Sequence, residues 1–193
     1  MSVFHSFVPK ESVNLLQKWK NELDIDIVIS TPRRTKLGDF KVQKKKLVIS
    51  INNDLNKYSF LITLTHELAH AFVYKQYSNK VLPHGKEWKK TFKSMLINFL
   101  PIFPEDIAKV LGKHLINPKA STFTDVNLSA VLRRYNSKTG LTISDLEEGT
   151  HFKISSGKEF VKGERIRKRF SCVELSSNKK YSFHPLAEVI VKQ

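Results

Sequence analysis

Two histidines and a glutamate stand within five residues of one another, in His66-Glu67-Leu68-Ala69-His70. Because the two imidazoles are four residues apart, they fall on one face of an α-helix, where both can bind a single Zn²⁺. The carboxylate between them is then placed beside the metal, where it can take a proton from a zinc-bound water. Residues 56–77 contain no proline or glycine and repeat apolar residues at helical spacing, so we expect a helix there, with Asp54 as its N-terminal cap.

A catalytic zinc site has three protein ligands and leaves the fourth position to water. The next histidine, His84, stands between Pro83 and Gly85, at a turn that precedes a helix expected over Lys86–Phe99. From that turn His84 can face back to the first helix. Glu87 is an alternative third ligand. His84 is favoured because the following glycine frees the backbone and because a neutral imidazole suits zinc.

These motifs resemble the SprT-like family of zinc metallopeptidases, which includes a protease of DNA–protein crosslinks. The resemblance covers residues 5–115 and rests on the pentad followed by His84-Gly85-x-x-Trp88. It also rests on Arg33-Arg34-Thr35-Lys36-Leu37-Gly38 and the extended run Lys46–Ile51 ahead of the pentad. It implies a zincin-like domain with His66, His70 and His84 as zinc ligands and Glu67 as the catalytic base. It further implies protein substrates and a role in DNA repair.

The chain departs from the family pattern at its C-terminal end. Many bacterial relatives finish with a zinc ribbon that carries paired cysteines, whereas this sequence has the single cysteine Cys172. A four-cysteine ribbon is therefore excluded. We expect Cys172 to be a small core residue in a strand.

The remaining pattern predicts an α+β fold in two parts. Residues 1–135 are expected to form the zincin-like domain, with an N-terminal helix, a short antiparallel sheet, the pentad helix and following helices. The expected elements outside the site are a helix over Pro9–Glu22, a strand over Asp26–Ser30, a hairpin of Phe40–Val42 and Lys46–Ile51, and helices over Glu105–Leu115 and from Asp125 to Tyr135.

Residues 141–193 are expected to form a small antiparallel β domain, in the place where relatives keep their ribbon. Short extended runs are punctuated there by Ser156-Gly157, Lys162-Gly163 and Ser177-Asn178. The runs are His151–Ile154, Glu159–Val161, Ile166–Leu175, Lys180–His184 and Glu188–Val191.

The charge balance indicates a polyanionic partner, which we take to be DNA. Lys plus Arg is 33 and Asp plus Glu is 18, a formal net charge of +15 with a pI near 9.9. Arg165, Arg167 and Arg169 alternate along the chain, so on a strand they would share one face that can follow a phosphate backbone. The turn Lys44-Lys45-Lys46 is expected to be a second contact region.

Composition also narrows the class of protein. One cysteine allows no internal disulfide, which fits a reducing compartment. No run approaches the roughly 18 apolar residues that a membrane span needs, and residues 1–13 lack the features of a signal peptide. We therefore expect a cytoplasmic protein without membrane contact, associated with the nucleoid if it is bacterial.

The sequence thus predicts a zinc-dependent peptidase that cleaves proteins bound or crosslinked to DNA. Two alternatives stay open. One is a nucleic-acid-binding module with a non-catalytic zinc site, although a structural site has no need of Glu67. The other is a zinc hydrolase without a DNA partner, against which the net charge is only weak evidence.

Overall fold

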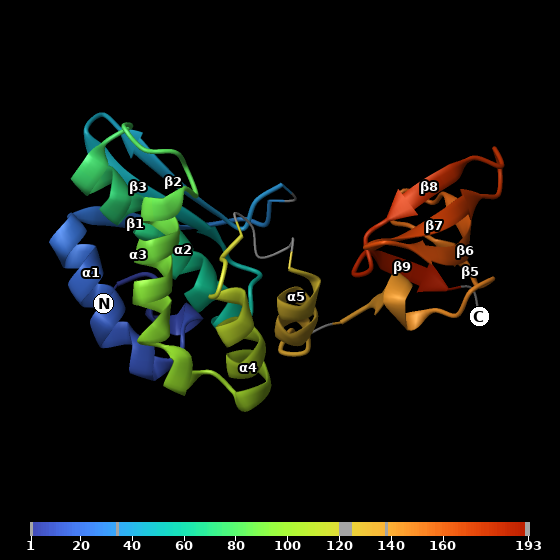
Figure 1. Cartoon of the computed structure of the whole chain (residues 1–193), viewed down its shortest axis with the longest axis horizontal. Helices are drawn as coiled ribbons and strands as arrows, with labels where there is room; N and C mark the ends of the chain where they lie inside the picture. Colours follow the sequence, from blue (N-terminus) through green and yellow to red (C-terminus); the bar gives the residue numbers. More distant parts are fainter. Residues whose placement is uncertain (1, 34, 120–124, 138, 192–193) are drawn as a thin grey trace. The chain divides into compact units, whose positions relative to one another are not determined.

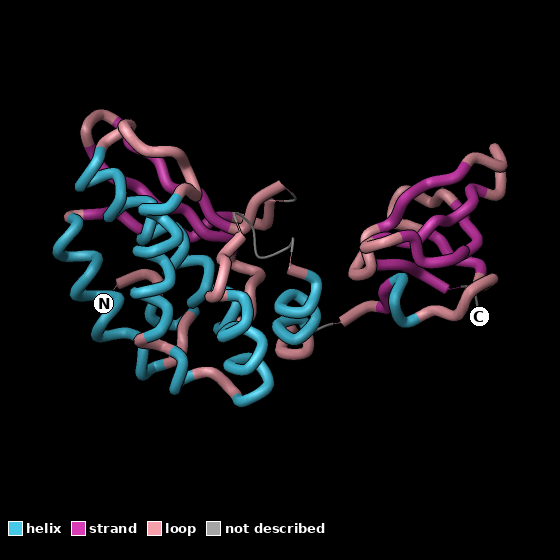
Figure 2. Tube along the Cα trace, in the orientation of Figure 1, coloured by secondary structure: helices cyan, strands magenta, loops and turns pink. Residues whose placement is uncertain are grey.

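In the computed structural model the chain forms two units, residues 1–136 and 137–193 (Figure 1). The structure describes residues 2–33, 35–119, 125–137 and 139–191, so Arg34 lies outside the described residues. Helices and strands are both abundant, and the fold is α+β as predicted (Figure 2). In these described ranges, no helix combines the length and the apolar character that crossing a bilayer requires.

The first unit contains the predicted helices and strands. Its elements are α1 (Val13–Leu23), β1 (Ile25–Ser30), β2 (Gly38–Gln43), β3 (Lys46–Asn52), α2 (Lys57–Tyr77), α3 (Lys86–Ile97), α4 (Glu105–His114) and α5 (Val126–Arg133). The first helix begins later than predicted because Lys10–Ser12 form a separate 3-10 turn.

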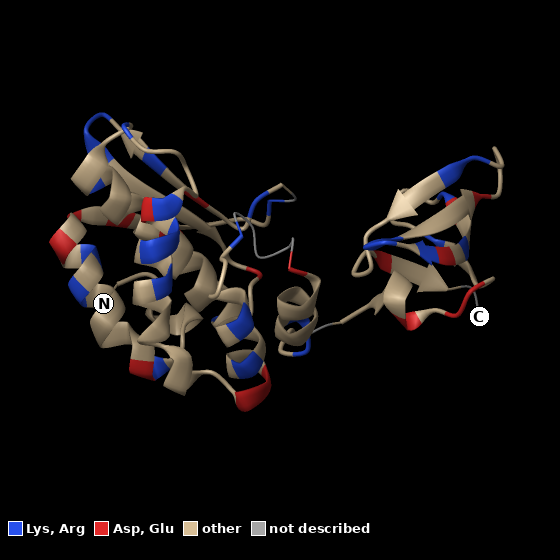
Figure 3. Cartoon of the chain, viewed as in Figure 1, with Lys and Arg blue, Asp and Glu red and all other residues tan. Residues whose placement is uncertain are grey.

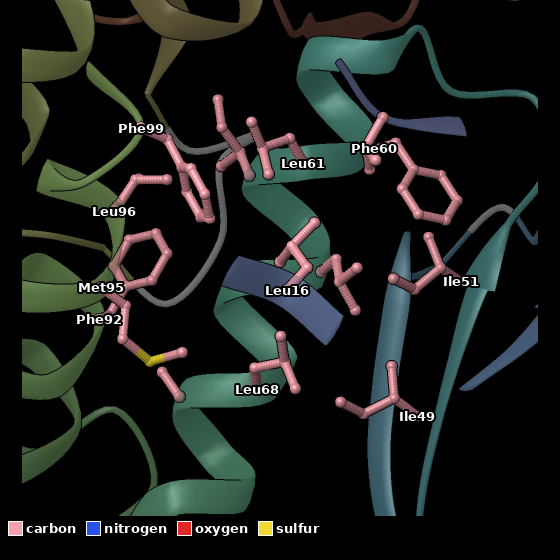
Figure 4. Close-up of a cluster of buried hydrophobic side chains, with 14 of the residues drawn as sticks. Leu16, Ile49, Ile51, Phe60, Leu61, Leu68, Phe92, Met95, Leu96 and Phe99 are labelled. Carbon is pink, nitrogen blue, oxygen red and sulfur yellow. The ribbon is translucent and has the colours of Figure 1, made fainter. Parts of the chain in front are cut away.

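Helix α2 lies at the centre of the first unit and is buried on nearly every side (Figure 4). Ile49 and Ile51 of the sheet pack against one side of it, and α3 packs against another with Phe92 and Leu96. Each such buried side chain contributes about 1.5–3 kcal/mol relative to an exposed one. The helix that carries the pentad is therefore fixed by layers on both sides.

Asn56, not Asp54, caps this helix, so the predicted cap was wrong. The Asn56 Oδ1 accepts hydrogen bonds from the backbone N–H groups of Tyr58 and Ser59, at 3.1 and 3.0 Å. Its amide nitrogen donates to the carbonyl of Leu132, which ties α2 to the end of α5. Asp54 is exposed and lies two residues before the cap position, too early to reach the first free N–H groups.

The sheet of the first unit has the order β1-β3-β2 and is mixed, which corrects the predicted antiparallel sheet. β2 and β3 form the predicted hairpin, with Gln43 paired to Lys46. β1 instead pairs with β3 in parallel, with Ile27 opposite Ile49. Because β3 is inserted between β1 and β2, the connection from β1 to β2 must pass the C-terminal end of β3, and β2 is left at an edge.

The second unit is one antiparallel sheet with the order β4-β9-β5-β6-β7-β8. Its strands are β4 (Leu141–Thr142), β5 (His151–Lys153), β6 (Glu159–Ile166), β7 (Arg169–Glu174), β8 (Lys180–Phe183) and β9 (Glu188–Val191). Phe152, Phe160 and Cys172 are buried in its core, so the prediction for Cys172 is confirmed.

The three arginines do not share a strand face, and that prediction was wrong. β6 ends at Ile166 and β7 begins at Arg169, so Arg167 lies in a two-residue turn with φ of 55°. Arg165 pairs with Phe170, and Ile166 pairs with Arg169. Arg165 and Arg169 therefore project from opposite faces of the sheet. The turn contains no Gly, Asn or Pro, so nothing in the sequence marked it.

The β2–β3 turn offers a test of local strain. Lys44 and Lys45 have φ of 45° and 68°, as a type I′ turn requires of residues that are usually Asn and Gly. We expect Lys45→Gly to raise the free energy of unfolding by about 0.5–1 kcal/mol, because glycine adopts this conformation without steric cost. Urea titration followed by tryptophan fluorescence measures it, since Trp19 and Trp88 both lie in the first unit. Lys46→Gly, in the strand, is the control and should destabilise. A loss of stability in Lys45→Gly would contradict the assigned turn.

Candidate metal centre

The structure brings His66, His70 and His84 together at one point. His66 and His70 lie one turn apart on α2, and His84 precedes α3. The Nε2 atoms of His66 and His84 are 3.1 Å apart, those of His66 and His70 are 3.2 Å apart, and those of His70 and His84 are 2.9 Å apart. Within the described residues this is the group of side chains that could hold a metal ion.

A tight turn delivers His84 to this point. The N–H of Gly85 donates to the carbonyl of Leu82 at 3.0 Å, and Pro83 occupies the second position of the turn. His84 takes the third position with φ of 57°, a left-handed conformation that histidine tolerates better than most residues. A methyl group on Gly85 would lie 2.9 Å from the Leu82 carbonyl oxygen, so this position excludes larger residues.

Protons alone cannot satisfy this arrangement. Each Nε2 either carries a proton and donates or carries a lone pair and accepts. Among three nitrogens in mutual contact, at least two are of the same kind, and that pair repels. A cation removes the conflict because it takes all three lone pairs at once. Bonds of 2.0–2.1 Å at the tetrahedral angle place ligand nitrogens about 3.3–3.4 Å apart, close to the observed separations.

Burial keeps the three imidazoles neutral. Desolvation is the main cause in each case, and it lowers the pKa of His66 to about 3 and that of His70 to about 4, with the neighbouring imidazoles adding to the effect. Burial also lowers the pKa of His84. At neutral pH all three rings therefore offer lone pairs, the state that metal binding needs.

Trp88 supports all three rings from one side. This residue of α3 is fully buried, and its ring centroid lies 4.6, 5.3 and 4.7 Å from those of His66, His70 and His84. Its indole N–H points at the carbonyl of His66 at 3.4 Å. Phe92, one turn along α3, stacks on its other side at 4.9 Å. The rings are thus held in place by packing within the core.

Glu67 faces the same cleft but leans against the sheet. A methyl group on Gly38 would lie 2.7 Å from its Oε1, so the close approach of α2 to β2 depends on that glycine. Burial raises the pKa of Glu67 to about 8, and the negative charge of Asp39 adds to the shift. A hydrogen bond from the backbone N–H of Phe40 acts in the opposite direction. A cation bound nearby would lower this pKa further.

Comparison with known proteins matches one part of the chain to a protein family. Residues 10–102 match the SprT-like family, a span that contains the three histidines, Glu67 and the strands beside them. The chain contains a SprT-like domain. That family is associated with metallopeptidase-like function. No curated protein and no solved structure matches the chain.

The cleft of the SprT-like domain has a volume of about 520 Å³. Its walls are residues 35–40, the metal face of α2, and residues 78–79 and 81–84 with Trp88. Tyr74 also lines it and packs on Phe40, whereas Tyr77 lines a separate hollow between α1, α2 and α3. Glu87, the alternative third ligand, lines that other hollow and is not part of the histidine cluster.

The predicted lysine contacts lie apart from the histidine cleft, and the predicted arginine contacts belong to the other unit. Lys44, Lys45 and Lys46 are exposed at the tip of the β2–β3 hairpin and do not line the cleft. The three arginines belong to the second unit, where Arg169 donates to Ser182 on the neighbouring strand. Sequence reasoning missed the parts played by Gly38 and by the Phe40 backbone, although Gly38 ends the motif Thr35-Lys36-Leu37-Gly38.

The metal centre predicts the effect of losing its third ligand. His84→Ala removes one of three lone pairs and should weaken zinc binding by more than about a hundredfold, since even residues that only support a ligand cost 10–100-fold. Elemental analysis after dialysis against a zinc buffer measures the content. Glu87→Ala is the control and should keep one zinc per chain. Full occupancy in His84→Ala with loss in Glu87→Ala would move the third ligand to Glu87.

Proposed function

We propose that this protein is a zinc-dependent metallopeptidase of the SprT-like type that cleaves proteins bound or crosslinked to DNA. One observation carries the peptidase part of the proposal. The three neutral imidazoles of a metal-binding cluster and the carboxylate of Glu67 face one open cleft. A structural metal site has no need of a buried carboxylate beside it, and burial of this one is costly unless it has a task.

Three imidazole donors that leave an open side suit zinc in a catalytic site. Zinc, when bound, polarises a carbonyl group and lowers the pKa of a water. Glu67 takes a proton from the attacking water and gives it to the leaving amide nitrogen. The Phe40 N–H, which donates to the Glu67 carboxylate, holds that carboxylate in place during the transfer. The proposed fold of this domain is that of a small zincin.

The edge of the sheet offers a place for the substrate. β2 lies at the end of the β1-β3-β2 order, and its residues Gly38, Asp39 and Phe40 line the cleft. An extended polypeptide can therefore add to β2 as a further strand, bound mainly through its backbone. Backbone recognition of this kind tolerates many side chains, which fits a peptidase that removes diverse proteins.

The catalytic role of Glu67 can be tested by Glu67→Gln. This variant keeps the size and hydrogen bonding of the side chain but cannot accept the proton, so cleavage should fall by about 10²–10⁴-fold with zinc retained. The assay is proteolysis of a DNA-bound protein, with and without DNA. Glu87→Gln makes the same chemical change outside the cleft and should be fully active. Undiminished cleavage by zinc-loaded Glu67→Gln would refute the mechanism.

The proposed DNA contact rests on the distribution of basic residues (Figure 3). The Lys44-Lys45-Lys46 turn is one region, and a row on α3 is another. Lys86, Lys89, Lys90 and Lys93 are spaced three and four residues apart, so they form one stripe along that helix. Within the described part of the chain, no carboxylate is ion-paired with this stripe. Nucleic acid is a partner that would use such uncompensated charge.

Whether the β2–β3 hairpin contacts DNA can be tested from the salt dependence of DNA affinity. Replacing Lys44, Lys45 and Lys46 by Gln should reduce the slope of log affinity against log salt by up to about three, since each lost phosphate contact removes about one. Fluorescence anisotropy at several salt concentrations measures it. The same charge change at Lys10, Lys18 and Lys20 is the control.

The corresponding variant with Arg165, Arg167 and Arg169 changed to Ser should lower the slope by about two or less, because these residues do not share a face. A slope that is unchanged in both variants would place the DNA contact elsewhere. If the wild-type protein cleaves proteins but does not bind DNA at low salt, it is a zinc hydrolase without a DNA partner. If it binds DNA and zinc but cleaves nothing, the metal site is non-catalytic. The proposed setting is cytoplasmic, at the nucleoid in a bacterium.

A further inference from the structure

The segment between β1 and β2 forms a wall of the cleft without belonging to any helix or strand. Its described residues, 31–33 and 35–37, lie at the C-terminal end of β3, and Thr35, Lys36 and Leu37 line the cleft. Backbone in such a connection has no ladder partners of its own. The contacts that hold this segment in one conformation therefore determine the shape of the cleft on this side.

Arg33 fastens this segment to β3. Its Nε donates to Asn52 Oδ1 at 2.9 Å, and its Nη1 donates to Ser50 Oγ at 2.9 Å. Its Nη2 donates to the Ser50 carbonyl at 3.1 Å and points at the Leu37 carbonyl at 3.5 Å. The planar fork of a guanidinium makes this set of bonds possible, and a lysine ammonium cannot reproduce it.

Asn52 fastens the same segment from the opposite side. Its side chain is almost wholly buried at the end of β3. The Nδ2 donates to the carbonyls of Arg33 and Lys36, at 3.2 and 3.1 Å. The backbone N–H of Asn52 donates to the Leu37 carbonyl at 2.9 Å. Arg33 and Asn52 thus form a hydrogen bond with each other, and their side chains also donate to the carbonyls of Arg33, Lys36 and Leu37 in the connection. We call this pair of side chains the Arg33–Asn52 clamp.

The segment held by the clamp continues directly into the residues that lie against Glu67. The residue after Leu37 is Gly38, which lies directly against the Glu67 carboxylate, and the Phe40 backbone is close enough to lower the pKa of that carboxylate. A shift of the segment would move both contacts. Glu67 is largely buried, so solvent could replace these contacts only in part.

We propose that Arg33 and Asn52 are positioning residues, which hold the cleft wall of residues 35–40 and through it the carboxylate of Glu67. The consequence for cleavage rests on the proposed peptidase function; the consequence for the cleft wall does not. Arg33 keeps its positive charge in the clamp, but its donors are engaged within the chain and are therefore less free to bind a phosphate directly. This distinguishes Arg33 from the exposed lysines of the β2–β3 turn.

The test is Arg33→Lys, which keeps the positive charge but loses the fork. Its matched control is Arg134→Lys, the same change at a side chain that is 69% exposed. The first readout is NMR of the zinc-loaded and metal-free proteins. We expect the Phe40 amide resonance to shift and the amides of residues 35–40 to exchange faster in Arg33→Lys, with α2 unchanged. Glu67→Gln gives the reference shift for the Phe40 amide.

The second readout is cleavage by the zinc-loaded protein. A displaced carboxylate should lower kcat by about ten- to a hundredfold, with KM and zinc content unchanged. Gly38→Ala forces Glu67 away directly, so it should reproduce the fall in kcat and the Phe40 shift while the amide of Asn52, which donates to the Leu37 carbonyl, stays protected from exchange. Asn52→Ala should behave like Arg33→Lys.

The outcomes separate this proposal from the proposed function. Wild-type amide shifts and exchange over residues 35–40 in Arg33→Lys would overturn the clamp. Loosened amides with wild-type kcat would overturn its link to Glu67, and loss of zinc would assign Arg33 to the metal site instead. If the wild-type protein cleaves nothing, the peptidase proposal fails, whereas the Phe40 resonance still decides whether the clamp places Glu67.

Discussion

The mutual approach of three imidazole nitrogens, 2.9–3.2 Å apart, is the constraint on which the first unit depends. Two of them require an unbroken helix that cannot rotate, and α2 meets this need because apolar residues fix it on nearly every side. The third requires a chain reversal that returns to α2, and the turn from Leu82 to Gly85 supplies it. Trp88 then fills the space beneath the rings, so the same residue serves the core and the site.

Burial of the Glu67 carboxyl group lowers the stability of the fold, in contrast to the apolar packing around it. Its pKa is raised above the ordinary value to about 8, so in the metal-free protein the folded state holds a proton that the unfolded state has released. Between the ordinary pKa of a glutamate and about 8, the free energy of unfolding therefore falls as the pH rises. The protein tolerates this residue because the Phe40 N–H compensates part of the cost. Stability is thus lowered at the place where the proposed chemistry needs a base, as is usual for functional sites.

The parts of the structure that depend on local spacing were predictable. The interval from His66 to His70 places both rings on one helix face, and Pro83 with Gly85 marks the turn that carries His84. The extended runs on either side of Lys44 and Lys45 predicted the hairpin. Contacts between distant residues were not predictable from these patterns. Gly38 meets Glu67, and Arg33 meets Asn52, only because β1 pairs with β3 in parallel, so that the connection to β2 must pass the end of β3. The turn at Arg167 was missed for a different reason, since it uses a left-handed arginine where glycine or asparagine is usual.

The position of His84 has a consequence for the chain as a polymer. His70 and His84 are fourteen residues apart, and the segment between them includes the end of α2 and an irregular loop. An ion held by both residues is a removable crosslink that closes this loop. Unlike a disulfide, it is held only by the folded chain, so its binding free energy adds to the stability of the fold. The single cysteine, Cys172, is free and buried in the other unit. Among the described residues, the metal centre is then the group that can crosslink distant parts of the chain. A chelator would remove this crosslink without breaking a covalent bond.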